Sequence, residues 1–163
     1  MELLSVHPQG LDNSGAGQLP VIEAIKNDLP HIKWVLPNAP YRSITANAGQ
    51  VGRGWFDIFS WDGEFKQEDS KGMLESAYTI DKYIQDEVDS GMPTERIVLG
   101  GFSQGALMSL LTGLTARKDG QFGGRVGWRL GGVALLSGWL PLRDTFPKVV
   151  PCHLLTRNGV DAC

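Results

Sequence analysis

The sequence predicts a single domain of the α/β class, built on an open and mostly parallel β-sheet. Short apolar runs alternate with amphipathic segments along the chain, which is typical of parallel βαβ units. The length of 163 residues fits one domain with one core. The 21 glycines gather in short runs without a fixed period, which indicates tight turns between regular elements.

Five short and mostly apolar runs are the expected strands. Each is bounded by glycine, proline or polar residues, as buried strands of a parallel sheet usually are. We expect them to lie side by side and parallel, at residues 3–6, 33–36, 96–99, 133–136 and 153–156.

Three segments between these strands have apolar residues at helical spacing. The first runs from Val21 to Leu29, the second from Ala77 to Val88, and the third from Ala106 to Leu114. Gly91 is the expected end of the second helix, because glycine is common just beyond a helix C-terminus.

Residues 41–72 are polar and contain an aromatic pair, Trp55 and Phe56. The segment is expected to be a long loop, and long loops within compact domains are usually functional or mobile. Without further information, the two aromatic residues are more typical of core or lid packing than of a binding site.

Composition excludes several classes of partner. A net charge of −3 gives no electrostatic reason to expect nucleic acid or an anionic membrane. The first residues lack the pattern of a signal peptide and no apolar run reaches spanning length, so stable membrane insertion is not expected. Cys152 and Cys163 do not make a disulfide framework, and a cytoplasmic or nuclear setting is the default expectation.

The run from Gly101 to Gly105 matches the pattern G-x-S-x-G, with Ser103 at its centre. The pentapeptide alone is a weak signal, but here a strand precedes it and a helix follows. Such a strand-to-helix turn exposes a serine Oγ above the carboxyl edge of the sheet, and glycine at both flanks removes steric clashes. A plain Gly-Ser turn is the alternative. We therefore predict that Ser103 is a nucleophile.

Two backbone N–H groups are candidates for an oxyanion hole. That of Gln104 lies at the start of the following helix, where N–H groups have no helical partner. The second donor is expected from the loop after the first strand, where Leu11 is the candidate. His7 lies on that same loop, which is the wrong place for a catalytic base.

Several stretches resemble the family of acyl-protein thioesterases and carboxylesterases, which are small α/β-hydrolases that cleave fatty acyl thioesters and esters. They cover most of the chain in the order of the family, and the Gly-Gly-Phe-Ser-Gln-Gly run is the most specific of them. The matching stretches are Leu36–Pro40, Gly54–Asp57, Glu87–Gly91, Arg96–Gly105 and Leu136–Leu142.

The resemblance implies the α/β-hydrolase fold, with helices on both faces of the sheet, and a Ser-Asp-His triad in that chain order. It implies no cofactor and no metal, and an acylated protein or a small acyl ester as substrate. It also implies that Leu11 and Gln104 supply the oxyanion N–H groups. The acyl chain is expected near residues 41–72, with Trp55 and Phe56 shaping the mouth of the site.

The chain departs from the family pattern in the loop after the first strand, which reads His-Gly-x-Gly-Asp-Ser-Gly in the family. Aligned on Ser14 and Gly15, the chain has Gln9 for the histidine, Asp12 for the second glycine and Asn13 for the aspartate. A side chain at position 12 is expected to hinder the approach of the loop to an oxyanion.

The C-terminal region departs further. Asp161 is the best match to the triad acid, and an aspartate without a catalytic role is the alternative. The sequence ends at Cys163, before any residue in the place of the family's histidine. We therefore expect the last strand and helix of the family's fold to be missing. We expect the general base to be missing as well, because neither His31 nor His153 is placed to take a proton from Ser103.

These observations favour a serine hydrolase whose activity is impaired in this chain. A non-catalytic acyl-binding protein of the same fold is the alternative. Nucleotide binding by residues 100–105 is remote, because no P-loop lysine follows and the glycine spacing is not G-x-G-x-x-G.

Overall fold

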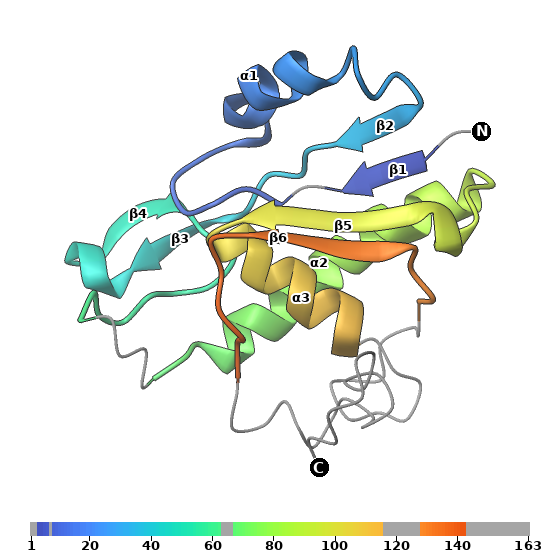
Figure 1. The fold of residues 1–163 in the computed structure, drawn as a ribbon. Helices are drawn as coiled ribbons and strands as arrows, with labels where there is room; N and C mark the ends of the chain where they lie inside the picture. Colours follow the sequence, from blue (N-terminus) through green and yellow to red (C-terminus); the bar gives the residue numbers. More distant parts are fainter. Residues whose placement is uncertain (1–2, 7, 63–66, 116–127, 143–163) are drawn as a thin grey trace, which may run out of the picture.

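The computed structural model describes residues 3–6, 8–62, 67–115 and 128–142 (Figure 1). Four parallel strands form its main sheet, in the order β2-β1-β5-β6. They are β1 (Leu3–Val6), β2 (Ile32–Val35), β5 (Ile97–Phe102) and β6 (Gly132–Leu136).

The four strands lie where the sequence predicted them; β1 has the predicted bounds, and the ends of the other three are shifted by at most three residues. The larger shift is at β5, which continues through two glycines to Phe102 because its register with β6 extends to the pair Phe102 and Leu136. The fifth predicted strand, 153–156, lies outside the described residues, as does Asp161.

Helices lie on both faces of the sheet, as expected from its parallel strands (Figure 1). Helix α1 (Gly15–Ile25) lies on one face, and helices α2 (Ser70–Asp89) and α3 (Gln104–Thr115) on the other. The prediction for α1 began too late, because Ser14 caps the helix by accepting a 3.0 Å hydrogen bond from the N–H of Gly17.

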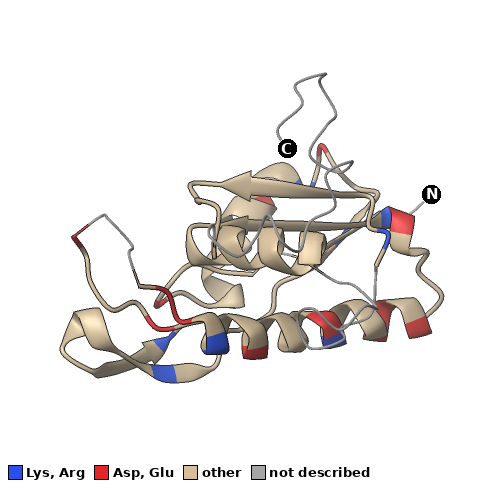
Figure 2. Cartoon of the chain, turned by 90° about the horizontal axis from the view of Figure 1, so that it is seen from below, with Lys and Arg blue, Asp and Glu red and all other residues tan. Residues whose placement is uncertain are grey.

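Helix α2 shows why one face of a helix packs and the other does not. Its buried residues recur at helical spacing and meet the core, whereas acidic and basic residues follow one another along its outer side (Figure 2). The helix ends at Asp89, just before Gly91, which has φ of 95°. The predicted stop is therefore confirmed.

The core lies between the sheet and the two helices α2 and α3. Strand residues contribute fully buried side chains from β1 and β5, and the helices contribute the opposing layer. Its fully buried members include Leu4, Val6, Ile80, Ile84, Ile97, Leu99, Leu107 and Leu111.

The prediction of a long loop over residues 41–72 was wrong at both ends, and α2 begins at Ser70, earlier than the predicted Ala77. Strands β3 (Tyr41–Ile44) and β4 (Gln50–Arg53) form an antiparallel hairpin outside the main sheet. Its turn contains the short 3-10 helix η1 (Thr45–Asn47) and two residues of positive φ, Ala48 (54°) and Gly49 (78°). Its sequence is polar because much of the hairpin is exposed.

A second 3-10 helix, η2 (Thr94–Arg96), leads into β5. None of the described helices combines the length and the apolar character that crossing a membrane requires.

Candidate active site

Ser103 occupies a sharp turn of one residue between β5 and α3. It has φ of 53°, in the left-handed region that non-glycine residues rarely adopt. Its N–H donates to the carbonyl of Leu136 (2.9 Å), and its carbonyl accepts from Ala106 (2.9 Å). The backbone is therefore held from β6 and from α3. The predicted placement of Ser103 at the carboxyl edge of β5 is confirmed.

The glycines on either side of Ser103 are required by their neighbours. A Cβ on Gly101 would lie 2.4 Å from the carbonyl carbon and oxygen of Gly105. A Cβ on Gly105 would lie 2.0 Å from the carbonyl oxygen of Pro8. Real Cβ atoms do not approach backbone so closely, so this turn closes only with glycine at both positions.

The loop after β1 passes directly beside Ser103. A Cβ on Gly10 would lie 3.6 Å from Cβ of Ser103 and 3.5 Å from the Phe102 carbonyl oxygen. The main chain at Gly10 thus lies against the turn, and the next residue is Leu11, the candidate for the second oxyanion donor. The two donor candidates, Leu11 and Gln104, come from segments that the fold brings together.

Asp12 aligns with a glycine of the family pattern, and it adopts φ of 55°, a conformation that favours glycine. Its N–H donates to the carbonyl of Arg53 in β4 (2.8 Å), and its carboxylate lies against Gly52, where a Cβ would be 1.9 Å from Oδ1. The side chain that was expected to hinder the loop is therefore turned toward the hairpin.

Gln9, which replaces the family's histidine, is fully buried. With its amide oriented to suit its neighbours, it donates to the carbonyl of Pro37 and accepts from the N–H of Ala39 (2.6 Å). It ties the loop after β1 to the loop after β2.

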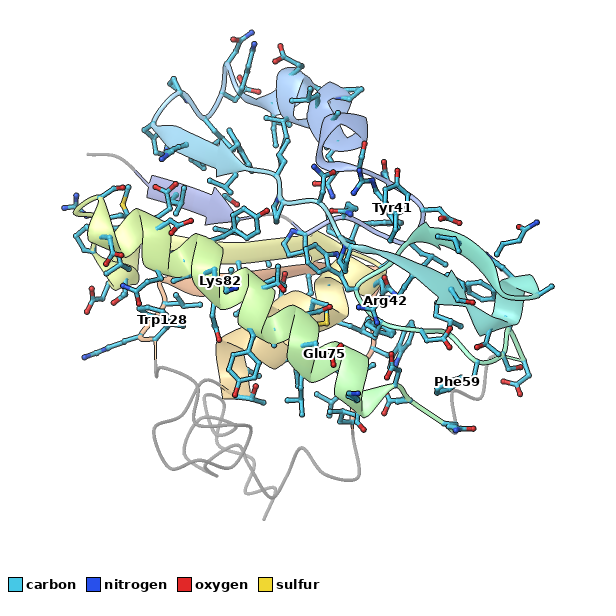
Figure 3. The ribbon with its side chains drawn as sticks, turned by 180° about the vertical axis from the view of Figure 1, so that it is seen from behind. Tyr41, Arg42, Phe59, Glu75, Lys82 and Trp128 are labelled. Atoms are coloured by element: carbon cyan, nitrogen blue, oxygen red, sulfur yellow. The ribbon has the colours of Figure 1, made fainter. Side chains whose placement is uncertain are left out.

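The segment from Gly54 to Asp57 has an irregular backbone whose polar groups are bound by side chains from elsewhere. Arg42 Nε donates to the carbonyl of Gly54 (2.7 Å), and the N–H of Asp57 donates to Asp69 (2.9 Å). Arg42 extends from β3 toward the start of α2 (Figure 3), where it also pairs with the N-cap residue Asp69 (3.4 Å).

Asp57 itself is a structural carboxylate. It accepts from the N–H (2.8 Å) and the hydroxyl (2.6 Å) of Thr45 in the hairpin turn. The segment after β4 is thereby fixed at both ends.

A cavity of about 290 Å³ opens beside this segment. Phe56 forms part of its wall as expected, whereas Trp55 is fully buried and does not line it, contrary to the expectation. Ser103 is not among its lining residues. The cavity meets the turn through Phe56, whose carbonyl accepts a hydrogen bond from Gln104 (2.7 Å). The residues that line it are Phe56, Asp57, Ile58, Phe59, Ser60, Asp62, Gln67, Glu68, Met73 and Trp139.

The far wall of the cavity was not predicted from the sequence. Trp139 follows β6, and Glu68 precedes α2 and accepts from the N–H of Leu142 (2.8 Å). The only indication of this wall in the sequence was Trp139, which lies in the stretch Leu136–Leu142 that resembles the family. Ser137, between β6 and Trp139, shares the left-handed conformation of Ser103 (φ 56°).

His31 immediately precedes β2 and so lies at the amino edge of the sheet, opposite Ser103. His7, His153 and Asp161 lie outside the described residues. Within the described ranges, no group of three or more His, Cys, Asp or Glu side chains is arranged to hold a metal ion.

Residues 7–155 match the model of the phospholipase/carboxylesterase family. The chain belongs to this family. Acyl-protein thioesterase 1 of Cryptococcus neoformans is 40% identical over 146 residues, covering 88% of the chain and 57% of that protein. Acyl-protein thioesterase 1 of Saccharomyces cerevisiae is 34% identical over 156 residues, covering 93% and 61%.

The fold is also similar to that of solved structures. Arabidopsis thaliana SOBER1 superposes with a TM-score of 0.79 at 27% identity, covering 93% of this chain and 68% of that one. Zea mays acyl-protein thioesterase 2 superposes with a TM-score of 0.74 at 29% identity, covering 90% and 61%. This phospholipase/carboxylesterase chain thus has the α/β-hydrolase fold, and it spans about three fifths of the length of the two fungal relatives.

Proposed function

We propose that the protein is a serine hydrolase that cleaves acyl thioesters or esters through an acyl-enzyme at Ser103. The observation that carries this proposal is the backbone of Ser103, which has φ of 53° and is flanked by two glycines that no other residue can replace without a clash. A strained serine between a strand and a helix is the arrangement of the nucleophile in this fold.

The chemistry follows from that placement. Ser103 Oγ bonds to the acyl carbonyl carbon, the bond from that carbon to the sulfur or oxygen leaving group breaks, and the hydroxyl proton passes through a general base to the leaving group. Water then releases the free acid and restores the hydroxyl. The N–H groups of Leu11 and Gln104 stabilise the negative charge on the carbonyl oxygen.

The cavity beside Phe56 is the proposed place of the acyl chain. Apolar side chains, including Phe56, Ile58, Met73 and Trp139, form much of its wall. Trp55 is buried and does not line the cavity, so it does not contact the acyl chain in this proposal. Acylated proteins are the proposed substrates because the fungal relatives are named acyl-protein thioesterases, and small acyl esters would use the same cavity.

Asp161 is the proposed acid, and the only histidine among the described residues, His31, lies at the amino edge of the sheet, away from Ser103. A serine hydroxyl without an assisting base is a poor nucleophile at neutral pH. Deacylation needs a base to activate water, whereas a p-nitrophenolate leaving group departs without help from an acid, so with such an ester deacylation is the slower step and the acyl-enzyme accumulates.

Trapping of the acyl-enzyme tests the proposal. The chain is incubated with a p-nitrophenyl ester of a long-chain acid, and its intact mass is followed with time. We expect one acyl group per chain, located on Ser103, and none in Ser103→Ala. A Ser103→Ala chain acylated like the wild type would overturn the proposal. Reversible ester binding without acylation would favour the acyl-binding protein.

A further inference from the structure

The side chain of Gln104 bridges two consecutive residues, the buried Trp55 and Phe56 in the cavity wall. Its Oε1 accepts from the N–H of Trp55 (2.7 Å), and its Nε2 donates to the carbonyl of Phe56 (2.7 Å). The residue is 1% exposed, so neither bond competes with bulk water. The two partners also fix which end of the amide is oxygen, because one supplies a donor and the other an acceptor.

Trp55 is hydrogen-bonded to three segments: the loop after β1, α2 and α3. Of its partners, Gln104 is the one adjacent to Ser103. The indole N–H of Trp55 donates to the carbonyl of Gln9 (2.9 Å), and its own carbonyl accepts from the hydroxyl of Ser76 in α2. These bonds hold Trp55 to the loop after β1 and to α2. The bond from Gln104 holds it to the turn that carries Ser103.

Gln104 therefore has two separate roles, one for its main chain and one for its side chain. Its main-chain N–H is a proposed oxyanion donor, at the first position of α3. Its side chain, anchored on the same backbone, binds the peptide group before Trp55 and the peptide group after Phe56. Any shift of the cavity wall relative to the oxyanion site must break one of two buried hydrogen bonds, which costs more than breaking exposed ones.

We propose that the Gln104 side chain is a positioning residue that sets the preference of the site for long acyl chains. It keeps the wall of the cavity in register with Ser103, so that a chain seated beside Phe56 presents its carbonyl at the nucleophile. This inference rests on the proposed function. It predicts that loss of the bridge lowers reactivity toward long chains more than toward short ones.

The test compares two fluorophosphonates, one with an ethyl and one with a dodecyl chain, in a buffer that contains imidazole as an external base. The rate of phosphonylation of Ser103 is measured for both, and their ratio corrects each variant for changes in its nucleophile. Gln104→Met keeps the length of the side chain and loses both bonds. Gln104→Glu, in its ionised form, keeps the acceptor for Trp55 and loses the donor to Phe56.

Ser109→Ala is the matched control. Ser109 is fully buried in the same helix, and its hydroxyl donates to the carbonyls of Gly100 (3.1 Å) and Gly105 (2.9 Å). It borders the same turn but has no bond to the cavity wall.

Exchange of the Trp55 amide hydrogen, followed by NMR, reports on the bridge directly. We expect Gln104→Met to speed this exchange about tenfold or more relative to amides of β5, whereas Gln104→Glu leaves it protected. We also expect the dodecyl-to-ethyl ratio to fall about tenfold in Gln104→Met, to fall in Gln104→Glu, and to stay within twofold in Ser109→Ala.

The outcomes separate the two proposals. A wild-type chain in which neither probe reacts at Ser103 would refute the proposed function and this inference with it. A reactive wild-type chain whose ratio is unchanged in Gln104→Met would refute the inference alone. An equal fall of the ratio in Ser109→Ala would do the same, since it would show that any loosening of the turn has this effect.

Discussion

Gly105 lies against the carbonyl of Pro8 so closely that a Cβ on Gly105 would be 2.0 Å from the Pro8 oxygen. This contact joins the start of α3 to the loop after β1, the two segments that carry the proposed oxyanion donors. The closeness of the two backbones is thus part of the site, and it depends on the absence of a single side chain.

Gly105→Ala should therefore lower the free energy of unfolding by about 2–3 kcal/mol, because the added methyl forces a backbone shift in a packed region. Gly132→Ala is the control, since a Cβ there meets nothing within 4 Å and φ is not positive. It should leave stability unchanged or raise it by up to about 1 kcal/mol. Urea unfolding of both variants measures the difference. Equal effects would show that the Pro8 contact is unimportant.

Two turn residues should respond to backbone conformation alone. Gly91 has φ of 95° and open space around it, so Gly91→Ala should lower the free energy of unfolding by about 1 kcal/mol through strain rather than contact. Ala48 has φ of 54°, so Ala48→Gly should raise it by about 0.5–1 kcal/mol. Opposite signs in thermal unfolding are the expected result, and the same sign for both would contradict the assigned turns.

Asp69 should be one of the more costly polar residues to remove. Its carboxylate caps α2 through the N–H of Gly72 (2.9 Å), binds the N–H of Asp57 (2.9 Å) and pairs with Arg42. Asp69→Ala should lower the free energy of unfolding by about 2–3 kcal/mol. Lys71→Ala, two residues away, removes an exposed ion pair with Glu75 (3.9 Å). It should change the free energy of unfolding by less than about 0.5 kcal/mol. Denaturant titration of both variants decides between these values.

The nucleophile turn could be predicted because its determinants are adjacent in the sequence. Gly101, Ser103 and Gly105 form a local pattern, and the strand before it and the helix after it have their own periodicities. The hairpin β3–β4 could not, although its strands are as long as β1 and β2, because Val51 and Tyr41 are exposed rather than packed in a core and its strands contain no apolar run. Nothing in their apolar pattern distinguishes them from a loop.

The side-chain role of Gln104 was out of reach for a different reason. Its partners Trp55 and Phe56 lie 49 and 48 residues earlier in the chain. Only the fold brings them together, and a glutamine has no sequence signature that names its partners. The same holds for Gln9, because its hydrogen-bond partners in the loop after β2 are distant in the sequence.

An external base tests whether a general base for Ser103 is missing. Imidazole at millimolar concentration should accelerate phosphonylation of Ser103 in proportion to its concentration, because it takes over the proton from the hydroxyl. The rate is followed by intact mass in a dilution series at constant pH and ionic strength. Fast labelling that does not respond to imidazole would show that a group of the chain already acts as base.

The position of a covalent adduct tests the central claim most directly. After reaction with a fluorophosphonate in the presence of imidazole, peptide mapping should find one phosphonyl group, on Ser103. Ser137→Ala should be labelled like the wild type, although Ser137 follows the neighbouring strand with nearly the same φ (56° against 53°). Ser103→Ala should carry no label. An adduct on Ser137, an equal adduct in Ser103→Ala, or no adduct in the wild type would contradict the assignment of Ser103 as the nucleophile.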